Sequence, residues 1–282
     1  GFTSFMIPVK ATTFPVATMI AATWNKDLAQ DRGKVMGKQA NELGISGWYG
    51  PAMNIHRNAL SGRNFEYYSE DGTLSGDMAA NEISGAKQYG VYAYMKHFAM
   101  NDQETNRLNK LLTWSSEQAI RETYLKPFEI AVKDGKATAA MSSFNYIGDK
   151  WSGANDALLQ KVLRGEWGFR GMVETDYFGG YGFMNGDNAI RNGNDVMLST
   201  TGESGSAITG TDKPATVKAM KNAAHNILYT VVNSSAYKNY NKGDSLKLPW
   251  QKTLMNYNIL AFAIFIMLQG LAIYLYRRQY RK

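Results

Sequence analysis

The chain has 282 residues, of which 44% are hydrophobic and 12% aromatic, enough for one sizeable core, so the composition argues against a disordered chain. It contains no cysteine, which excludes a disulfide framework and a thiolate metal site. The net charge is +7, but four of these charges, Arg277, Arg278, Arg281 and Lys282, lie in the last six residues.

Cofactor, metal and nucleic-acid sites have little support in this sequence. The basic residues before the C-terminal cluster are interspersed with acids, so we expect no nucleic-acid partner. His56, His97 and His225 lie far apart without a helical i, i+4 pair, so we expect no metal site. No Gly-rich phosphate loop follows a predicted strand, which argues against a nucleotide cofactor, and we expect no cofactor.

Helical stretches alternate with short apolar runs along residues 1–240, which indicates an α/β fold with a parallel sheet. Asn25 is the predicted N-cap of the first helix, and Ser115 with Gln118 forms a predicted capping box for the second. In chain order the predicted elements are helix 24–43, strands 45–49 and 91–97, helix 115–134, strand 137–144, helix 155–167, strands 171–176 and 195–198, and helix 214–232.

Polar residues follow the apolar runs of the predicted strands. A TIM barrel delivers its catalytic groups at the C-terminal strand ends, and a doubly wound sheet binds ligands at the same ends, so both topologies remain open on the pattern alone. Asp176 stands at such an end in the stretch FRGMVETDYFGG. The glycine-rich run behind it gives Asp176 no helix to cap, so we expect it to face a pocket.

Two further groups could take part in a polar site. Lys96 and His97 adjoin at another strand end, where a cation would favour the ionised form of a nearby carboxylate. The loop GRNFEYYSEDG at 62–72 carries an arginine, three acids and three aromatics, a combination suited to sugars but also common in surface loops. The residues alone therefore predict a carboxylate-bearing pocket, with carbohydrate as one ligand.

The C-terminal stretch ILAFAIFIMLQGLAIYLY at 259–276 is apolar except for Gln269 and, extended back to 256, has the length of a bilayer-spanning helix. Aromatic residues flank both ends, and the RRQYRK tail predicts a cytoplasmic C-terminus. We therefore expect a membrane-anchored protein whose globular domain is extracellular, with lipid around the helix. The predicted segments are a globular domain at 1–238, a polar linker at 239–255, the membrane helix at 256–276 and a basic tail at 277–282.

Six long motifs resemble the barrel domain of glycoside hydrolase family 3, the β-glucosidase family, over roughly residues 10–237. They occur in the family's order: TTFPVATMIAATWN, GPAMNIHRNALSGRNFEYYSED, KHFAMNDQETNR, RETYLKPFEIAVKDGKATAAMSSFN, LLQKVLRGEWGFRGMVETDY and AIRNGNDVML. The resemblance implies a (β/α)8 TIM barrel and retaining, exo-acting hydrolysis of a terminal β-linked glucose or related sugar through a covalent glycosyl-enzyme. The implied partner is a β-linked oligosaccharide or glucoside.

The resemblance also implies roles for seven residues. Asp176 matches the nucleophile of the family's S/T-D-W motif, here T-D-Y, so that Tyr177 replaces the more usual tryptophan. The matched residues that hold the hydroxyls of the terminal sugar, or line the same subsite, are Arg63, Lys96, His97, Met141 and Phe144.

Two departures from the family pattern predict an incomplete site. Only GFTSFMIPVKA precedes Thr12, so we expect a barrel without its first strand and without the aspartate that ends it. Retaining hydrolysis also needs a second carboxyl group about 5 Å from the nucleophile, which in most of the family lies in an α/β sandwich domain. Glu174 is too close along the strand to be that partner, which leaves Glu66, Glu70 and Glu104 as candidates within the chain.

A barrel followed by a membrane helix fits family members with the sandwich first and the barrel last. We therefore expect a C-terminal part of a reversed-order member, with the acid/base in an upstream or separate α/β sandwich domain. The alternative is a catalytically incomplete, membrane-anchored protein that binds sugar or acts as a scaffold.

Overall fold

The computed structural model describes residues 12–200, 202–238 and 249–280. The chain divides into two compact units, one of residues 13–239 and one that contains the C-terminal helix. The two units are described separately below.

A four-stranded parallel sheet in the order β1-β2-β4-β7 is the centre of the first unit. Each strand pairs in parallel with the next strand of this series. Such an order is typical of repeated βα units, in which a crossover connection carries the chain back to begin the next parallel strand. Val196 continues the order through a parallel bridge to Glu174. The strands are β1 (Gly47–Trp48), β2 (Tyr92–Phe98), β4 (Ala139–Ser142) and β7 (Met172–Thr175).

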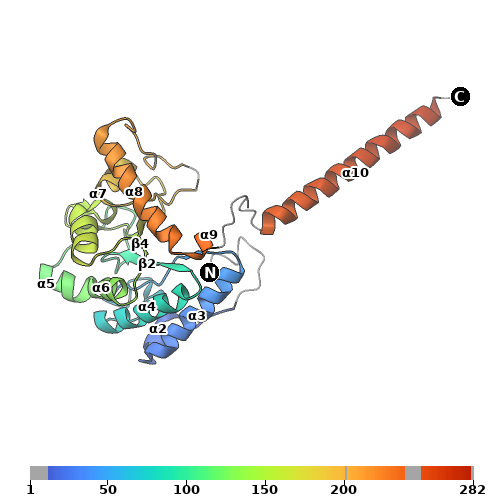
Figure 1. The fold of residues 1–282 in the computed structure, drawn as a ribbon. Coiled ribbons are helices and arrows are strands. Elements are labelled where there is room, and N and C mark those ends of the chain that lie inside the picture. The colour runs from blue at the N-terminus through green and yellow to red at the C-terminus, as the bar shows by residue number, and fades with distance from the viewer. Residues whose placement is uncertain (1–11, 201, 239–248, 281–282) are drawn as a thin grey trace. The chain divides into compact units, whose positions relative to one another are not determined.

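Helices pack against this sheet, with α3 and α4 side by side and α8 along another part of it (Figure 1). The main core contains Phe98, Phe128 and Val173, and the Phe98 and Phe128 rings meet edge-on with centroids 5.1 Å apart. The helices are α2 (Ala17–Ala21), α3 (Lys26–Glu42), α4 (Gly72–Lys87), α5 (Glu117–Ala119), α6 (Lys126–Lys133), α7 (Gly186–Asn192), α8 (Pro214–Val232) and α9 (Ser235–Lys238).

Shorter segments complete the unit. A small sheet consists of β3 (Leu112–Thr113), β5 (Tyr146–Ile147) and β6 (Lys150–Trp151), with β3 and β5 parallel and β5 and β6 antiparallel. The 3-10 segments are η1 (Asn64–Glu66) and η3 (Ser152–Ala154), and the π-helical segments are η2 (Ile120–Tyr124) and η4 (Ala157–Glu166).

Most predicted elements are confirmed, with some corrections. The side chain of Asn25 caps α3 by accepting hydrogen bonds from the backbone N–H groups of Asp27 and Leu28. The capping box at Ser115 is wrong: Ser116 is the N-cap, and the helix continues through η2 into α6. The strand predicted at 195–198 is reduced to the single bridge at Val196.

The α/β fold with a parallel sheet is confirmed, and the eight-stranded barrel remains a prediction. Within the described residues, β1 forms no ladder with the Val196 end of the sheet, so the strands there do not close. Residues 1–11, on which the expected absence of the first strand depends, lie outside the described residues.

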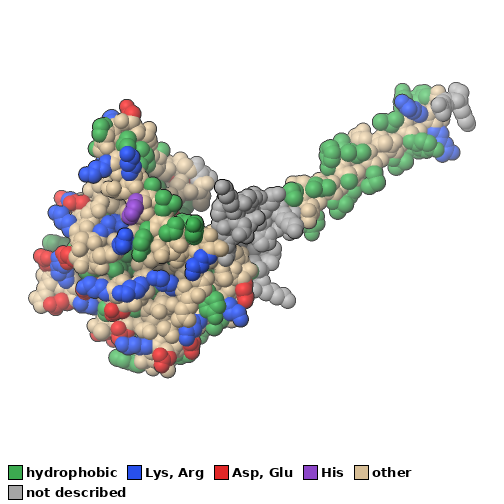
Figure 2. All heavy atoms as spheres, in the orientation of Figure 1, with side chains coloured by type: hydrophobic (Ala, Val, Ile, Leu, Met, Phe, Trp, Pro, Cys, Tyr) green, Lys and Arg blue, Asp and Glu red, His purple; other side chains and the backbone are tan. Residues whose placement is uncertain are grey.

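The second unit contains α10 (Pro249–Gln279). Its segment Leu254–Gln279 is the one described helix long and apolar enough to cross a membrane, by length and composition only. Hydrophobic side chains cover α10 from Leu254 onwards, and Lys and Arg side chains appear towards its C-terminal end (Figure 2). Residues 249–255 of the predicted linker are helical in α10, whereas 239–248 lie outside the described residues.

Candidate active site

Asp176 directly follows β7, where its backbone N–H donates to the carbonyl oxygen of Ser142 in the neighbouring β4 (3.0 Å). Alternation along β7 directs the side chains of Glu174 and Asp176 to the same face of the sheet. The next helix, α7, begins only at Gly186 with Asn185 as its N-cap. Asp176 therefore caps no helix, as the glycine-rich run behind it predicts.

The carboxylate of Asp176 is largely buried, with 13% of the side chain exposed. Its Oδ1 accepts a hydrogen bond from the backbone N–H of Tyr177 (2.7 Å), whereas the buried Oδ2 has no hydrogen-bond partner within the described structure. A buried carboxylate oxygen in this state is costly unless another group comes to bind it. The Oδ2 atom is therefore available to bind a ligand group.

Opposing influences act on the pKa of Asp176. Burial raises it, and the Tyr177 N–H together with Arg107, Arg63 and Lys96 lowers it, with burial the larger effect. The nearby cations therefore offset only part of the effect of burial on this pKa.

The side chain of His97 faces the free oxygen, with Nε2 3.6 Å from Asp176 Oδ2. It lies within β2, and both of its backbone polar groups bond to Asn54: the N–H donates to Oδ1 (2.8 Å), and the carbonyl accepts from Nδ2 (2.9 Å). Burial, Arg63, Lys96 and Arg107 together hold the pKa of His97 well below its usual range. The imidazole that faces Asp176 is therefore neutral.

Arg63 and Arg107 are held in place by two glutamates. Arg63 forms ion pairs with Glu66 and with Glu104, the latter at 3.7 Å, and the Nε of Arg107 lies 2.9 Å from Glu104. The Arg107 guanidinium also stacks over the Phe144 ring, 4.7 Å from its centroid. This arrangement uses Glu104 to keep two cations near the carboxylate of Asp176.

Burial alone lowers the pKa of Arg63, but Tyr67, Glu66 and Glu104 outweigh that effect and leave it raised. Lys96, next to His97 in β2, has a pKa lowered first by burial and further by Arg63. Its half-buried ammonium is a donor that lies on the same strand as His97.

Met141 and Tyr177 complete the predicted set. Met141 in β4 is 3% exposed and is paired in register with Glu174, so it projects from the same face of the sheet. The ring of Tyr177 is 38% exposed, and its hydroxyl donates to Glu203 (2.9 Å). The seven predicted residues thus lie around the ends of β2, β4 and β7 and in the 62–66 loop.

Glu174 is a second buried carboxyl group on the same face as Asp176. Its pKa is raised to about 7, first by burial and also by repulsion from Asp176, while Tyr49 and Tyr94 lower it. The hydroxyl of Tyr49 donates to Oε1 at 3.4 Å, and Oε2 has no hydrogen-bond partner within the described structure. This group lies in β7 only two residues before Asp176 and on the same face, so it does not stand across a ligand from it.

The three glutamates considered as a second carboxyl group have other partners. Glu66 and Glu104 pair with arginines, and Glu70 accepts from the hydroxyl of Ser69 at 3.2 Å. Among the described residues, no cluster of three or more His, Asp or Glu side chains has the arrangement of a metal site.

Sequence reasoning missed Arg107, Tyr67 and Asn54 as site residues. The signal for Arg107 was present, because it ends the motif KHFAMNDQETNR that begins with Lys96. Tyr67 and Asn54 both contact His97 and lie within the motif GPAMNIHRNALSGRNFEYYSED, but sequence spacing alone does not indicate their contact with the distant strand β2.

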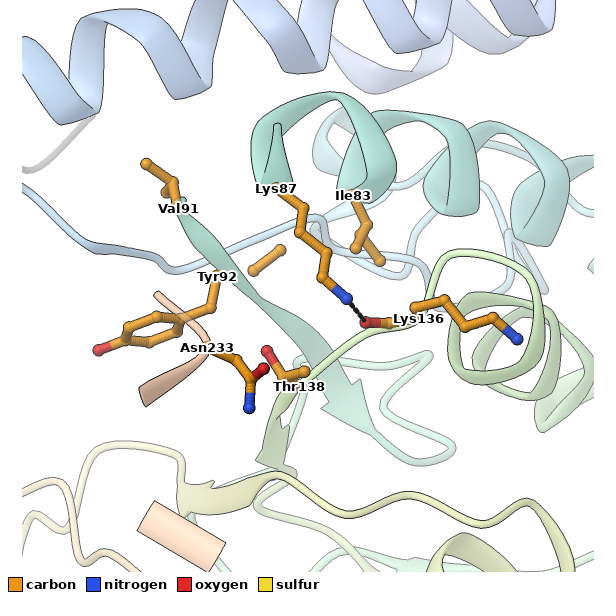
Figure 3. A pocket seen from close by; sticks show the side chains of 8 residues that line it. Ile83, Lys87, Val91, Tyr92, Lys136, Thr138 and Asn233 are labelled. Carbon is orange, nitrogen blue, oxygen red and sulfur yellow. Dashed lines mark hydrogen bonds between the residues drawn. The ribbon is translucent and has the colours of Figure 1, made fainter. Parts of the chain in front are cut away.

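A small cavity elsewhere in the unit is distinct from this site. Lys87, Lys136 and Thr138 are among its lining residues, and the Lys87 ammonium donates to the carbonyl oxygen of Lys136 at 3.1 Å (Figure 3). These residues lie before β4 and near the start of β2, at the strand ends opposite to Asp176.

The model of the glycosyl hydrolase family 3 N-terminal domain matches residues 6–225 of the chain. The chain is 41% identical over 192 residues to beta-glucosidase A of Butyrivibrio fibrisolvens, covering 68% of this chain and 23% of that protein. It is 38% identical over 241 residues to a beta-glucosidase of Ruminococcus albus, covering 82% of this chain and 25% of that protein. The chain therefore spans about a quarter of the length of these relatives.

Solved structures with the same fold include two beta-glucosidases. Beta-glucosidase 3B from Thermotoga neapolitana, in complex with glycerol, has a TM-score of 0.74 at 40% identity, covering 85% of this chain and 34% of that one. The family 3 beta-glucosidase from Bifidobacterium adolescentis has a TM-score of 0.77 at 30% identity, covering 85% and 35%.

Proposed function

Because the chain belongs to glycosyl hydrolase family 3, we propose that it is the sugar-binding and nucleophile-bearing part of a retaining, exo-acting β-glucosidase. The observation that carries the proposal is the buried Oδ2 of Asp176, which has no hydrogen-bond partner in the described structure and lies beside His97. The names of the relatives add that proteins of this family act on β-glucosides.

In the proposed reaction the ionised carboxylate of Asp176 attacks the anomeric carbon of a terminal β-linked glucose or related sugar. The bond to the leaving-group oxygen breaks, and an acid elsewhere protonates that oxygen. Water, deprotonated by the same group, then hydrolyses the glycosyl ester and restores Asp176. The three nearby cations counter the effect of burial on the pKa of Asp176 and thereby enlarge its reactive fraction.

The other predicted residues are assigned to binding of the terminal sugar. Arg63, Lys96 and His97 are proposed to hold its hydroxyl groups, with Arg63 and Lys96 as the hydrogen-bond donors. The buried side chains of Met141 and Phe144 are proposed to shape the subsite, and the exposed ring of Tyr177 to stack on a sugar face.

The acid/base is proposed to come from another domain or chain, in the manner of an α/β sandwich. Glu66 and Glu104 are committed to ion pairs with Arg63 and Arg107, and Glu174 lies on the same strand as Asp176. These commitments support the assignment of the acid/base to another domain or chain.

The finer architecture is also part of the proposal. It comprises a (β/α)8 barrel completed by segments beyond the described residues, the reversed module order, and a membrane anchor formed by α10. Anchoring is supported by the length and composition of Leu254–Gln279, and the arginines at 277 and 278 favour a cytoplasmic C-terminus with the catalytic domain extracellular.

An aryl β-glucoside with a good leaving group tests the proposal, since its departure needs little help from an acid. The full chain should release a burst of phenol that matches the protein concentration, and Asp176→Ala should abolish it. Asp149→Ala, a change at an exposed aspartate, is the matched control and should retain the burst. The absence of a burst with every aryl glycoside would instead favour a protein that binds sugar without cleaving it.

A further inference from the structure

The imidazole of His97 lies between two groups with different hydrogen-bonding abilities. On one side, Nε2 is 3.6 Å from Asp176 Oδ2. On the other side, Nδ1 is 3.4 Å from the hydroxyl of Tyr67 and 3.4 Å from Oδ1 of Asn54. His97 and Tyr67 are 2% and 1% exposed, so water does not compete for either ring nitrogen.

A neutral imidazole carries one proton, and its partners decide which nitrogen holds it. An ionised Asp176 can only accept, and its Oδ2 has no other partner in the described structure. With the proton on Nε2, His97 donates to this charged acceptor, and such bonds are about twice as strong as neutral ones. With the proton on Nδ1, a lone pair of Nε2 would face the carboxylate.

The Tyr67 hydroxyl is the group near Nδ1 that can donate. Its oxygen accepts from Asn101 Nδ2 (3.2 Å), and its own proton can reach either the Asn101 carbonyl oxygen (3.3 Å) or His97 Nδ1 (3.4 Å). Burial raises the pKa of Tyr67, so the phenol keeps this proton. Asn54 Oδ1, the other polar atom near Nδ1, can only accept.

We propose that Tyr67 is a positioning residue that sets the tautomer of His97, donating to Nδ1 so that the ring proton stays on Nε2 and points at Asp176. The 3.4–3.6 Å distances are long for hydrogen bonds, and such contacts shorten when a ligand fills the site. The effect on glycoside cleavage rests on the proposed function, whereas the tautomer is a property of the free protein.

Nitrogen NMR of the full chain, labelled with ¹⁵N in the histidine rings, measures the tautomer directly, because protonated and unprotonated ring nitrogens resonate far apart. The His97 signals are those lost in His97→Gln. We expect the proton on Nε2 in the native chain. In Tyr67→Phe the ionised Asp176 still favours the proton on Nε2, but Asn54 Oδ1 becomes the remaining polar partner of Nδ1, so the fraction of His97 protonated on Nδ1 should rise. A proton on Nδ1 of the native chain would overturn the proposal without any variant at Tyr67.

Tyr68→Phe is the matched control. Tyr68 is equally buried at 1% exposure, but its hydroxyl donates to Glu82 instead of His97, so the His97 tautomer should not change. A Tyr67→Phe protein that folds and keeps the native fraction of Nε2 protonation would contradict the proposal. If glycosyl labelling of Asp176 fails while the tautomer responds as expected, the proposed function fails and the role of Tyr67 stands.

Discussion

At the scale of single residues, burial and nearby charges shift the pKa of Asp176 in opposite directions. Desolvation raises its pKa, and Arg107, Arg63 and Lys96 lower it from different parts of the chain. Each arginine is fixed by Glu104, and Arg63 also by Glu66. Glu66 and Glu104 therefore act on the pKa of Asp176 indirectly, because they position the two arginines near it.

As the pH is lowered, the rate of covalent labelling of Asp176 should begin to fall at a higher pH in Arg107→Gln than in the native chain. Asp176 reacts when ionised, so labelling is lost as the pH falls through its pKa, and removal of a nearby cation raises that pKa. We expect the acid limb of the rate profile to move upward by about one pH unit. Arg121→Gln, which disrupts an exposed ion pair with Glu166, should leave the profile unchanged, and an unshifted profile for Arg107→Gln would contradict this role.

At the scale of elements, the sequence predicted the helices and strands that have a clear apolar period or a clear cap. Helix α8 has the predicted bounds, Pro214–Val232, and Asn25 caps α3. Helix α4 was missed because its buried face is rich in Gly, Ala and Ser, which gives a weak apolar period. The nucleophile candidate followed from a motif, whereas Tyr67 and Asn54 depend on contacts that only tertiary structure creates.

Gly85→Ala should disrupt the packing of α3 against α4. A Cβ at Gly85 would meet the backbone carbonyl oxygen of Gln30 well inside contact distance, and Gly33 faces Glu82 in the same way. We expect a loss of roughly 1–3 kcal/mol in the free energy of unfolding, measured by denaturant titration. In Gly165→Ala the nearest atom is 3.3 Å away, so that control should lose little, and equal stability of the two variants would contradict the account.

At the scale of the whole molecule, a polar unit with a buried carboxylate site and a long apolar helix belong to one chain. On the face in view, basic and acidic side chains intermingle over the globular unit, whereas hydrophobic side chains cover α10 (Figure 2). The proposed membrane anchor requires such a contrast between the two surfaces.

The full chain should therefore float with phosphatidylcholine vesicles in a density gradient. Ile264→Asp combined with Leu268→Asp should abolish flotation, because each aspartate near the centre of a span costs about 3 kcal/mol to insert. Leu60→Asp, at a leucine with 89% exposure in the globular unit, should still float. Flotation of the double variant would contradict an anchoring role for α10.

The central claim is that Asp176 is the nucleophile, and mechanism-based labelling with a 2-deoxy-2-fluoro-β-glucosyl fluoride tests it most directly. Fluoride leaves without strong acid assistance, so an acid/base outside the chain is not required, and the 2-fluoro group slows hydrolysis of the adduct. The account predicts one glycosyl adduct per chain, mapped by mass spectrometry of peptides to Asp176. An adduct on another carboxylate, or none at saturating reagent, would contradict it.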